Sequence, residues 1–461
     1  MKYPTYVVLY MHSMTPALRP RTLGLFVGDL LFFTFSLWLS LYLRTFDVPS
    51  LMLFWAHLVP FSLLFLVWAI VFFIAGLYES RSIILERRAI SITLLATQLA
   101  NVIIAALFFS LIPIFGIAPK TLLVIYLIVS FILVLLWRVA LFPQVGFRRK
   151  EQALVVGGGG EVLELVEALY KARHAPTVIA QVLEPESPTL VQDIQDAVAE
   201  FNPRFIIADF TDPLVVAAFP NLYNYLTRGI RFFDALSLYE EVFGRVPLSV
   251  INQEWLARNV SRYSHTLYDT FKRIMDIAIS IPIAILSLVA YPFIAAAIKL
   301  EDRGPVLISL PRVGEANQTF NLYKFRSMSG NDGGTYGTDG VSKLRVTRVG
   351  KFLRITRLDE IPQLWSVIAG RLSLIGPRPE TPTLVELYTK EIPYYNVRHL
   401  VRPGLSGWAQ LYGQHAHHGV GFDETRNKLS HDLYYIKHRS LTLDAVVILK
   451  TIKKLFTRSG V

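Results

Sequence analysis

The sequence of 461 residues contains no cysteine. This absence excludes disulfides, thiolate metal sites and cysteine nucleophiles, and it leaves the redox compartment undetermined. Charge is also scarce, since Asp, Glu, Lys and Arg make up 18 % of the chain, whereas 53 % is hydrophobic and the mean hydropathy is +0.43. This composition excludes a soluble globular protein of the ordinary kind, so several domains and a membrane are expected.

Negative charge is the scarcer sign. The chain has 35 Asp and Glu against 46 Lys and Arg, which gives a net charge of +11 and a sequence pI near 9.6. Such a balance favours anionic partners, among which phospholipid, nucleic acid and phosphorylated metabolites all qualify. Charge alone does not choose among them.

Four long apolar runs occupy the first third of the chain, at 23–43, 51–77, 93–116 and 121–142. Each is near the ~20 residues that a helix needs to cross ~30 Å of hydrocarbon, so residues 1–150 are predicted to form four transmembrane helices. Basic residues cluster before the first run, between the second and third, and after the fourth. The positive-inside rule therefore predicts that the N-terminus and everything after residue 145 are cytoplasmic. Asp29 and Arg138 lie inside these runs, where an interhelix or headgroup contact is favoured over a transport path.

Strand and helix patterns alternate between residues 151 and 245, as in a small doubly wound, Rossmann-like α/β domain. Its glycine run, Gly157 to Gly160, sits between a strand and a helix, where a dinucleotide pyrophosphate would bind. However, the G-x-G-x-x-G spacing counted from Gly157 ends on Val162, and Glu161 places a negative charge at the helix N-terminus. We therefore interpret the run as a tight turn in a degenerate domain with a regulatory or packing role.

A polar linker, 246–266, leads to a last region, 267–461, that is predicted to be mainly helical and opens with an apolar stretch from Ile277 to Leu300. A spanning helix there would carry residues 301–461, with 23 Lys and Arg against 14 Asp and Glu, to the outside of the cell. Such a basic region fits better beside the anionic inner leaflet. Because Pro282 and Pro292 also interrupt helical hydrogen bonding, we expect a re-entrant helical hairpin at about 271–300 that enters and leaves on the cytoplasmic side.

The segment 355–379, "ITRLDEIPQLWSVIAGRLSLIGPRP", sets two adjacent carboxylates, Asp359 and Glu360, before apolar residues at helical spacing. Taken alone, an Asp at this point is typical of an N-cap and the Glu of a residue that complements the helix dipole. The surrounding cations favour a second interpretation. They stand beside glycines, prolines or aromatics, in positions suited to gripping phosphate oxygens: Lys324, Arg326, Arg378 and Arg402.

Adjacent acids among such cations indicate a phosphoryl-transfer site, in which a carboxylate can attack phosphorus. Mg²⁺ is the expected cofactor, because it is held by one or two carboxylates together with substrate phosphates. His415, His417 and His418 are a weak zinc signal and are interpreted as a loop.

Six motifs in fixed order carry a resemblance: "FKRIMDI", "DRGPVL", "YKFRSM", "GKFLRITRLDEIPQLWSVIAGRLSLIGPRP", "VRPGLSGWAQ" and "DLYYIKHRSL". The C-terminal 195 residues or so resemble the catalytic domain of bacterial polyprenyl-phosphate hexose-1-phosphate transferases. These monotopic phosphoglycosyl transferases start capsule, exopolysaccharide or O-antigen synthesis. The four N-terminal helices and the degenerate α/β domain are similar to those of the large subclass, so the likeness covers nearly the whole chain.

The resemblance implies that a UDP-hexose gives its sugar phosphate to undecaprenyl phosphate, releasing UMP. It implies a ping-pong scheme in which Asp359 forms a covalent phospho-sugar, with Glu360 and Asp432 at the Mg²⁺ site. By the same resemblance Lys272 and Arg273 lie near the lipid headgroup. The remaining candidates for substrate contacts, to phosphate or nucleotide, are Lys324, Arg326, Arg354, Arg378 and Arg402. By the same likeness the protein is a multi-pass protein of the bacterial inner membrane with a cytoplasmic catalytic domain. Membrane lipid is a further partner, a homodimer is suggested by analogy, and no nucleic acid is expected.

The chain departs from the family's pattern at two places. Leu288 and Val289 stand where the family has a Ser-Pro pair that breaks the re-entrant helix, and Gly413-Gln414 stands where many members have Gly-Arg. The glycine-rich stretch 329–340 fits either a mobile lid or a plain insertion. Two alternatives stay open: a membrane-anchored nucleotide-sugar dehydratase or epimerase, for which Tyr268 and Lys272 form the only Tyr-x-x-x-Lys pair considered, and a non-catalytic scaffold or regulator of polysaccharide assembly. The sequence leaves the hexose and the pathway undetermined.

Overall fold

The computed structural model describes residues 6–7, 20–74, 77–78, 87–111, 120–142, 151–171, 177–260, 266–329, 345–413 and 421–457. They form two compact units, Met1–Ala235 and Leu236–Val461. The predictions made for the glycine-rich stretch, for His415 to His418 and for Gln414 fall on residues 330–344 and 414–420, outside the described residues.

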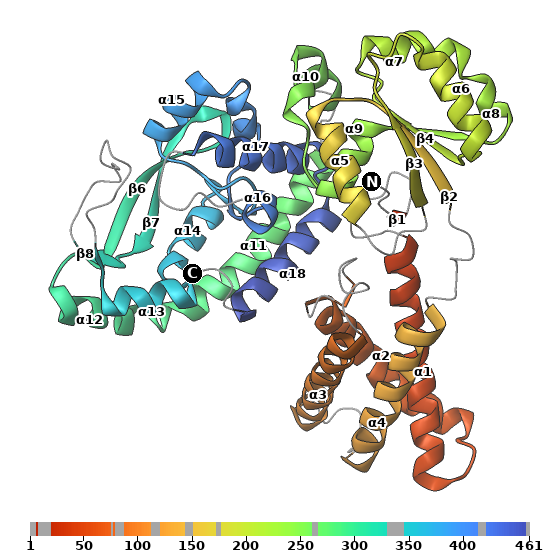
Figure 1. Cartoon of the computed structure of the whole chain (residues 1–461). Coiled ribbons are helices and arrows are strands. Elements are labelled where there is room, and N and C mark those ends of the chain that lie inside the picture. Colours follow the sequence, from red (N-terminus) through yellow and green to blue (C-terminus); the bar gives the residue numbers. More distant parts are fainter. Residues whose placement is uncertain are drawn as a thin grey trace. The chain divides into compact units, whose positions relative to one another are not determined.

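The N-terminal region is helical, as its apolar runs predict. It contains α1 (Pro20–Thr45), α2 (Leu51–Ile74), α3 (Arg87–Leu111) and α4 (Lys120–Leu136), the last continued by a π-helical turn, Trp137–Leu141. Among the described residues of this region, three stretches are long and apolar enough to cross a membrane: Leu23–Thr45, Leu51–Phe73 and Thr121–Leu141. In α3 the apolar helical stretch is shorter, Ala100–Ser110. The helices pack side by side around buried aromatic rings such as Phe33, Trp68 and Tyr126 (Figure 1).

The two charges predicted inside these helices meet. Arg138 donates from Nε to Asp29 Oδ1 over 3.0 Å and from Nη1 to the carbonyl oxygen of Leu77 over 2.7 Å. The hydroxyl of Tyr78 donates to Asp29 Oδ2 over 2.7 Å. The predicted interhelix contact is therefore confirmed, and the buried carboxylate is compensated by a cation and a hydroxyl.

The second part of this unit is a five-stranded sheet of order β1-β3-β2-β4-β5. Strands β2 (Glu151–Val156), β3 (Thr177–Leu183), β4 (Phe205–Ala208) and β5 (Arg231–Asp234) are parallel, and the short β1 (Tyr6–Val7) is antiparallel to β3. The connections include α5 (Gly160–Lys171), α6 (Leu190–Phe201), α7 (Pro213–Ala218) and α8 (Asn224–Thr227) (Figure 1). A hollow of about 640 Å³ lies at the glycine run, with Glu184 and Glu186 in its lining. These acids add to the negative charge of Glu161, which disfavours a pyrophosphate there.

The second unit begins with α9 (Ala235–Phe243, whose first residue belongs to the other unit) and α10 (Gln253–Asn259). A bent helix pair follows. The chain direction bends by 56° between helix α11 (Thr266–Leu288) and helix α12 (Tyr291–Asp302). The break thus falls next to Leu288 and Val289, where the family has its Ser-Pro pair, and not at Pro282. Pro282 lies inside α11 without ending it, whereas Pro292 occupies the first turn of α12, where its missing N–H costs nothing.

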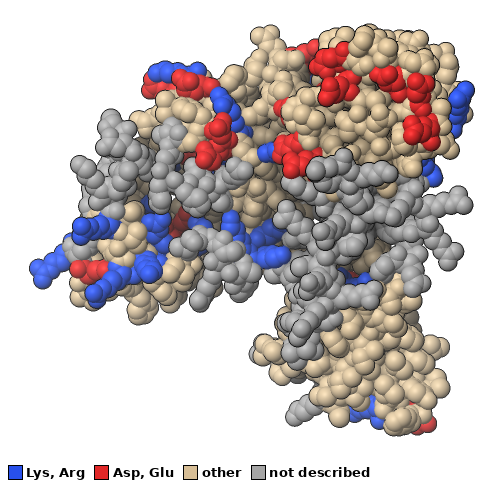
Figure 2. Space-filling model, viewed as in Figure 1, with Lys and Arg blue, Asp and Glu red and all other residues tan. Residues whose placement is uncertain are grey.

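The rest of this unit mixes helices with short strands, so it is less purely helical than predicted. A hairpin of β6 (Leu307–Val313) and β7 (Thr319–Phe325) precedes α13 (Arg348–Thr356), a 3₁₀ turn (Leu358–Glu360) and α14 (Gln363–Ile368). The two-residue strands β8 (Met328–Ser329) and β9 (Arg345–Val346) pair with each other in an antiparallel sense. Then come β10 (Ser373–Ile375), α15 (Pro382–Glu391), a 3₁₀ helix (Tyr395–Leu400), β11 (Gly404–Ser406), α16 (Trp408–Tyr412), α17 (Phe422–Lys437) and α18 (Leu441–Thr457). Figure 2 shows Lys and Arg gathered along the edge formed by α12 and α13.

Candidate active site

Asp359 lies in a turn that the backbone shapes unusually. Helix α13 ends at Thr356, and Arg357 takes the left-handed conformation, φ 57°, before the 3₁₀ turn Leu358–Glu360. This conformation is uncommon for a residue with a side chain, so the surrounding fold must hold it. The reversal buries the Asp359 side chain, which is 7 % exposed, and its Oδ1 has no hydrogen-bond partner among the residues that the structure describes. Since α14 begins only at Gln363 and its N-cap is Pro362, Asp359 does not act as the N-cap.

Glu360 is anchored where Asp359 is not. Its Oε1 accepts from Arg378 Nη2 over 3.1 Å and lies 3.8 Å from Arg357 Nη1. Burial by itself would raise the pKa of Glu360, but the guanidinium groups of Arg378 and Arg357 outweigh it and lower that pKa. The side chain remains 20 % exposed. Glu360 is therefore an ionised acceptor at the edge of the site.

The pKa of Asp359 moves in the opposite direction. Burial raises it first, the neighbouring charge of Glu360 raises it further, and Lys324 on β7 opposes both. Burial in turn lowers the pKa of the Lys324 ammonium, against the attraction of Asp359. Two adjacent carboxylates whose pKa values are driven apart are typical of catalytic pairs, in which the two groups take different roles.

The loop that carries Arg378 is held by neighbours from distant parts of the chain. Strand β10 pairs in parallel with β11, which follows Arg402, and the amide of Gly404 donates to the carbonyl oxygen of Pro377 over 2.9 Å. A Cβ on Gly404 would lie 2.1 Å from the amide nitrogen of Gly376, so only glycine permits this approach. The motifs "IGPRP" and "VRPGLSG" are thus joined backbone to backbone.

Four of the predicted site residues meet in this cluster: Asp359, Glu360, Lys324 and Arg378. Arg354, exposed in the last turn of α13, acts on Asp359 only through its charge. Arg402 pairs instead with Glu315 over 3.2 Å in an exposed ion pair. Arg326 is 8 % exposed and packs against Gly304, where a Cβ would lie 1.3 Å from its Nη1.

The two cations predicted near the lipid headgroup have internal partners. Arg273 donates from Nη1 to the carbonyl oxygen of Val367 over 2.6 Å and from Nη2 to that of Ile368 over 2.7 Å. It thereby satisfies the last carbonyls of α14, the helix that follows the carboxylate pair. Lys272 pairs over 2.9 Å with Asp444 of α18, which is fully buried.

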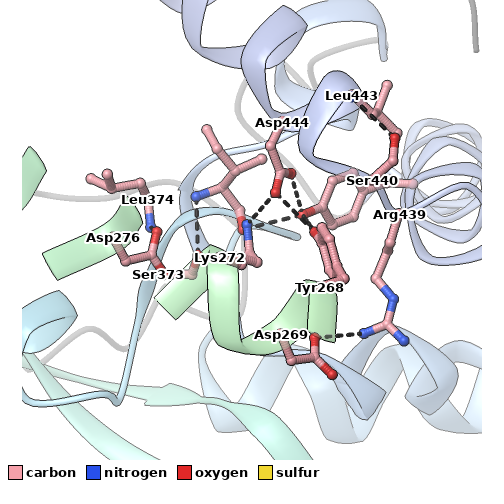
Figure 3. A network of polar contacts seen from close by, with 12 residues as sticks. Tyr268, Asp269, Lys272, Asp276, Ser373, Leu374, Arg439, Ser440, Leu443 and Asp444 are labelled. Atoms are coloured by element: carbon pink, nitrogen blue, oxygen red, sulfur yellow. Dashed lines mark hydrogen bonds and ion pairs between the residues drawn. The ribbon is translucent and has the colours of Figure 1, made fainter. Parts of the chain in front are cut away.

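Figure 3 shows the network around Asp444. The hydroxyl groups of Tyr268 and Tyr435 donate to its carboxylate over 2.9 and 2.8 Å, and Asp276 accepts from the amide of Leu374 in β10 over 3.1 Å. The Tyr-x-x-x-Lys pair, Tyr268 and Lys272, therefore binds the buried carboxylate of Asp444. This removes the main support for a dehydratase or epimerase, whose pair must face the sugar.

Asp432, the predicted metal assistant, is 1 % exposed and lies 2.8 Å from Arg398 Nη2. Within the described ranges, no group of three or more His, Asp or Glu is arranged to hold a metal ion. The orphaned oxygen of Asp359 and the ionised Glu360 nevertheless suit Mg²⁺, which needs only one or two carboxylates beside substrate phosphates.

Sequence reasoning did not select four residues that shape this site: Arg357, Glu380, Arg398 and Lys428. Arg357 and Glu380 lie within motifs that the sequence analysis singles out, "ITRLDE" and "GPRPE". Arg398 and Lys428 carry no local signal, because they meet their partners only in the folded chain.

Comparison with known proteins places the C-terminal region in a family. The family model for bacterial sugar transferases matches residues 267–458. An exopolysaccharide production protein PSS from Rhizobium leguminosarum is 34 % identical over 41 % of this chain and 96 % of its own length. A UDP-glucose:undecaprenyl-phosphate glucose-1-phosphate transferase from Caulobacter vibrioides is 36 % identical over 41 % of this chain and 71 % of its own length. The chain belongs to the bacterial sugar transferase family.

Another member of this family is a UDP-N-acetylgalactosamine-undecaprenyl-phosphate N-acetylgalactosaminephosphotransferase from Aeromonas hydrophila. It is 44 % identical over 50 % of this chain, and the match spans 53 % of its length. In this relative and three further ones, the match with the present chain spans between 36 % and 53 % of the relative's own length. Family membership therefore rests on the C-terminal region.

Proposed function

We propose that the chain transfers a sugar 1-phosphate from a UDP-hexose to undecaprenyl phosphate, which initiates synthesis of a surface polysaccharide. The observation that carries the proposal is the carboxylate pair: Asp359 is buried with an unpartnered oxygen, beside a Glu360 that two arginines keep ionised. The names of relatives in the family, which include undecaprenyl-phosphate transferases of glucose and of N-acetylgalactosamine phosphate, support the same reaction.

The proposed reaction has two displacements at one phosphorus. A carboxylate oxygen of Asp359 attacks the phosphorus that bears the sugar, and the bond to the bridging oxygen breaks, so that UMP leaves with that oxygen. A phosphate oxygen of undecaprenyl phosphate then attacks the same phosphorus. The bond to Asp359 breaks, which gives undecaprenyl-diphospho-sugar and restores the carboxylate. One substrate is soluble and the other lies in the bilayer, so a covalent intermediate lets a single site serve them in turn.

The residues around the pair have separable roles in this scheme. Lys324 faces the phosphate that is transferred and lowers the pKa of the nucleophile. Arg378 and Arg357 keep Glu360 ionised. Mg²⁺ held by Glu360 would neutralise charge on the substrate phosphates.

Incubation with UDP-N-acetylgalactosamine, UDP-glucose and other UDP-sugars, Mg²⁺ and undecaprenyl phosphate tests the proposal. We expect UMP release with at least one donor and, with the donor alone, a phospho-sugar adduct in the intact mass. Both are expected to vanish in Asp359→Asn. Turnover of a donor without undecaprenyl phosphate to a keto sugar or an epimer would favour the dehydratase or epimerase, and no turnover of any donor would favour the scaffold.

We further propose that α11 and α12 form a re-entrant hairpin that leaves the catalytic region in the cytoplasm. Both ends of the pair are bound to the same unit. Tyr268 and Lys272, near the start, each bond to Asp444 of α18 over 2.9 Å. At the end, Glu301 accepts from the amides of Arg348 and Val349 over 2.6 and 3.0 Å. Exposed apolar side chains mark the bend, among them Leu286, Val289 and Phe293. A pair tied to one unit at both ends returns to the side from which it came.

The absence of native cysteine allows a direct test of this topology. A maleimide that does not cross membranes should label Val48→Cys, between α1 and α2, in intact spheroplasts. It should label Glu386→Cys in α15 only after permeabilisation. Labelling of Glu386→Cys in intact spheroplasts would overturn the orientation.

The proposed organisation also includes four transmembrane helices in residues 1–150, a degenerate Rossmann-like domain at 151–245, a linker at 246–266 and a homodimer.

A further inference from the structure

The guanidinium of Arg398 forms several hydrogen bonds near the site. Its side chain is 1 % exposed, and its guanidinium donates to three partners. Nε and Nη2 lie 3.0 and 2.8 Å from Asp432 Oδ2, Nη1 donates to the hydroxyl of Tyr395 over 2.7 Å, and Nη2 donates to the main-chain oxygen of Arg378 over 2.9 Å. The planar fork of an arginine can bind three partners at once, which the single ammonium of a lysine does less well.

The third of these partners connects Asp432 to the carboxylate pair. Arg378 is held at its carbonyl oxygen by Arg398, and its own guanidinium holds Glu360 over 3.1 Å. Two residues later, Glu380 forms an ion pair with Lys428. Lys428 and Asp432 are four residues apart on α17, so they share one face of that helix. One helical turn of α17 therefore fixes both ends of the segment 378–380.

We propose that Asp432 is a positioning residue for Arg378, acting through Arg398, rather than a ligand of Mg²⁺. This inference rests on the proposed function. The oxygen Oδ2 of Asp432 is already shared by two N–H groups of Arg398. A divalent cation at that carboxylate would lie beside the buried guanidinium, and like charges repel strongly where water is excluded. In this arrangement Asp432 orients the guanidinium, the guanidinium fixes the main chain of Arg378, and Arg378 holds Glu360.

Two variants test the inference in the full chain, Asp432→Asn and Arg398→Lys. The lysine keeps a cation for Asp432 but loses the fork that reaches Arg378 and Tyr395. In each we expect kcat to fall by about 10²-fold, the loss that a displacement of about 1 Å can cause. The Mg²⁺ concentration for half-maximal rate should rise by a similar factor in both variants, because each affects the metal only through Arg378 and Glu360.

The matched control is Glu240→Gln. Glu240 is a buried acid of the same unit that pairs over 2.8 Å with Lys437, also on α17. Its loss should lower the thermal midpoint without the fall in kcat. In the background of Arg378→Gln, Asp432→Asn should add less than about twofold, since both act through one group. A rise in the half-saturating Mg²⁺ concentration that is tenfold larger for Asp432→Asn than for Arg398→Lys would overturn the inference, because it would identify Asp432 as a metal ligand. Full additivity with Arg378→Gln, or a kcat equal to that of Glu240→Gln, would also overturn it.

A readout without substrate separates the inference from the proposed function. Amide hydrogen exchange of the peptide that covers residues 373–381 should be faster in Arg398→Lys than in wild type, and unchanged in Glu240→Gln. Unchanged exchange in Arg398→Lys would refute the positioning role even if the wild type is active. A wild type without transferase activity but with the faster exchange would refute the function and leave the mechanical link standing.

Discussion

The ion pair between Glu380 and Lys428 leads to a quantitative prediction. Burial by itself would raise the pKa of Glu380, but Lys428 and Arg398 outweigh it and lower that pKa from 4.5 to about 2. At about 1.4 kcal/mol per pH unit, the ionised Glu380 contributes about 3 kcal/mol to stability at neutral pH. Glu380→Gln should remove this contribution and lower the thermal midpoint of the C-terminal unit by about 6–12 °C.

The pH dependence gives the sign of the effect. Because the pKa is lower in the folded state, the contribution is complete above the unfolded value of 4.5 and is lost as the pH falls through about 2. The difference between wild type and Glu380→Gln, measured by tryptophan fluorescence during heating, should therefore shrink over this window. Glu386→Gln is the matched control, since its pair with Lys390 is exposed, and it should leave the midpoint unchanged. Equal midpoints for Glu380→Gln and wild type at pH 7 would refute the reasoning.

Further predictions concern the carboxylates, the metal and the backbone contact. Glu360→Gln removes a like charge and lowers the pKa of Asp359, so the acid limb of the pH profile of kcat/KM should move to lower pH. Lys324→Met removes an attracting cation and should move the same limb to higher pH. Shifts in the opposite sense would contradict these electrostatic assignments. Chelation with EDTA should abolish UMP release and added Mg²⁺ should restore it, and full activity in EDTA would exclude the metal. Gly404→Ala forces a Cβ to 2.1 Å from the Gly376 amide and should destabilise the unit by about 1–3 kcal/mol in denaturant unfolding, which an unchanged midpoint would contradict.

Much of the fold follows from local patterns in the sequence. Apolar runs predict the helices of the N-terminal region, and alternating patterns predict the parallel sheet. The bent pair was predicted from Pro282 and Pro292, but the break lies at the family's position between α11 and α12. Pro282 is accommodated because a helix in an apolar environment can absorb one missing hydrogen bond when neighbouring groups compensate.

The site could be predicted where its residues are close in sequence or, as for Lys324, stand in one of the quoted motifs. Asp359 and Glu360 are adjacent, and Arg378 lies in the same motif, so their meeting follows from the chain itself. Arg398 is separated from Asp432 by 34 positions, and Lys272 from Asp444 by 172. Which cation pairs with which acid depends on the tertiary arrangement, because any Lys or Arg can pair with any carboxylate that the fold brings near. For this reason the sequence assigned Lys272 to a headgroup, whereas the structure gives it a buried aspartate.

Three charged side chains within five residues of α11 determine how this protein can be prepared in the laboratory. Lys272, Arg273 and Asp276 bond respectively to α18, to the end of α14 and to β10. Deleting the bent pair to obtain a water-soluble fragment would leave the buried Asp444 without its lysine partner and the last carbonyls of α14 without donors. The bent pair therefore also holds the fold of its own unit together, and preparations must retain it together with detergent or lipid.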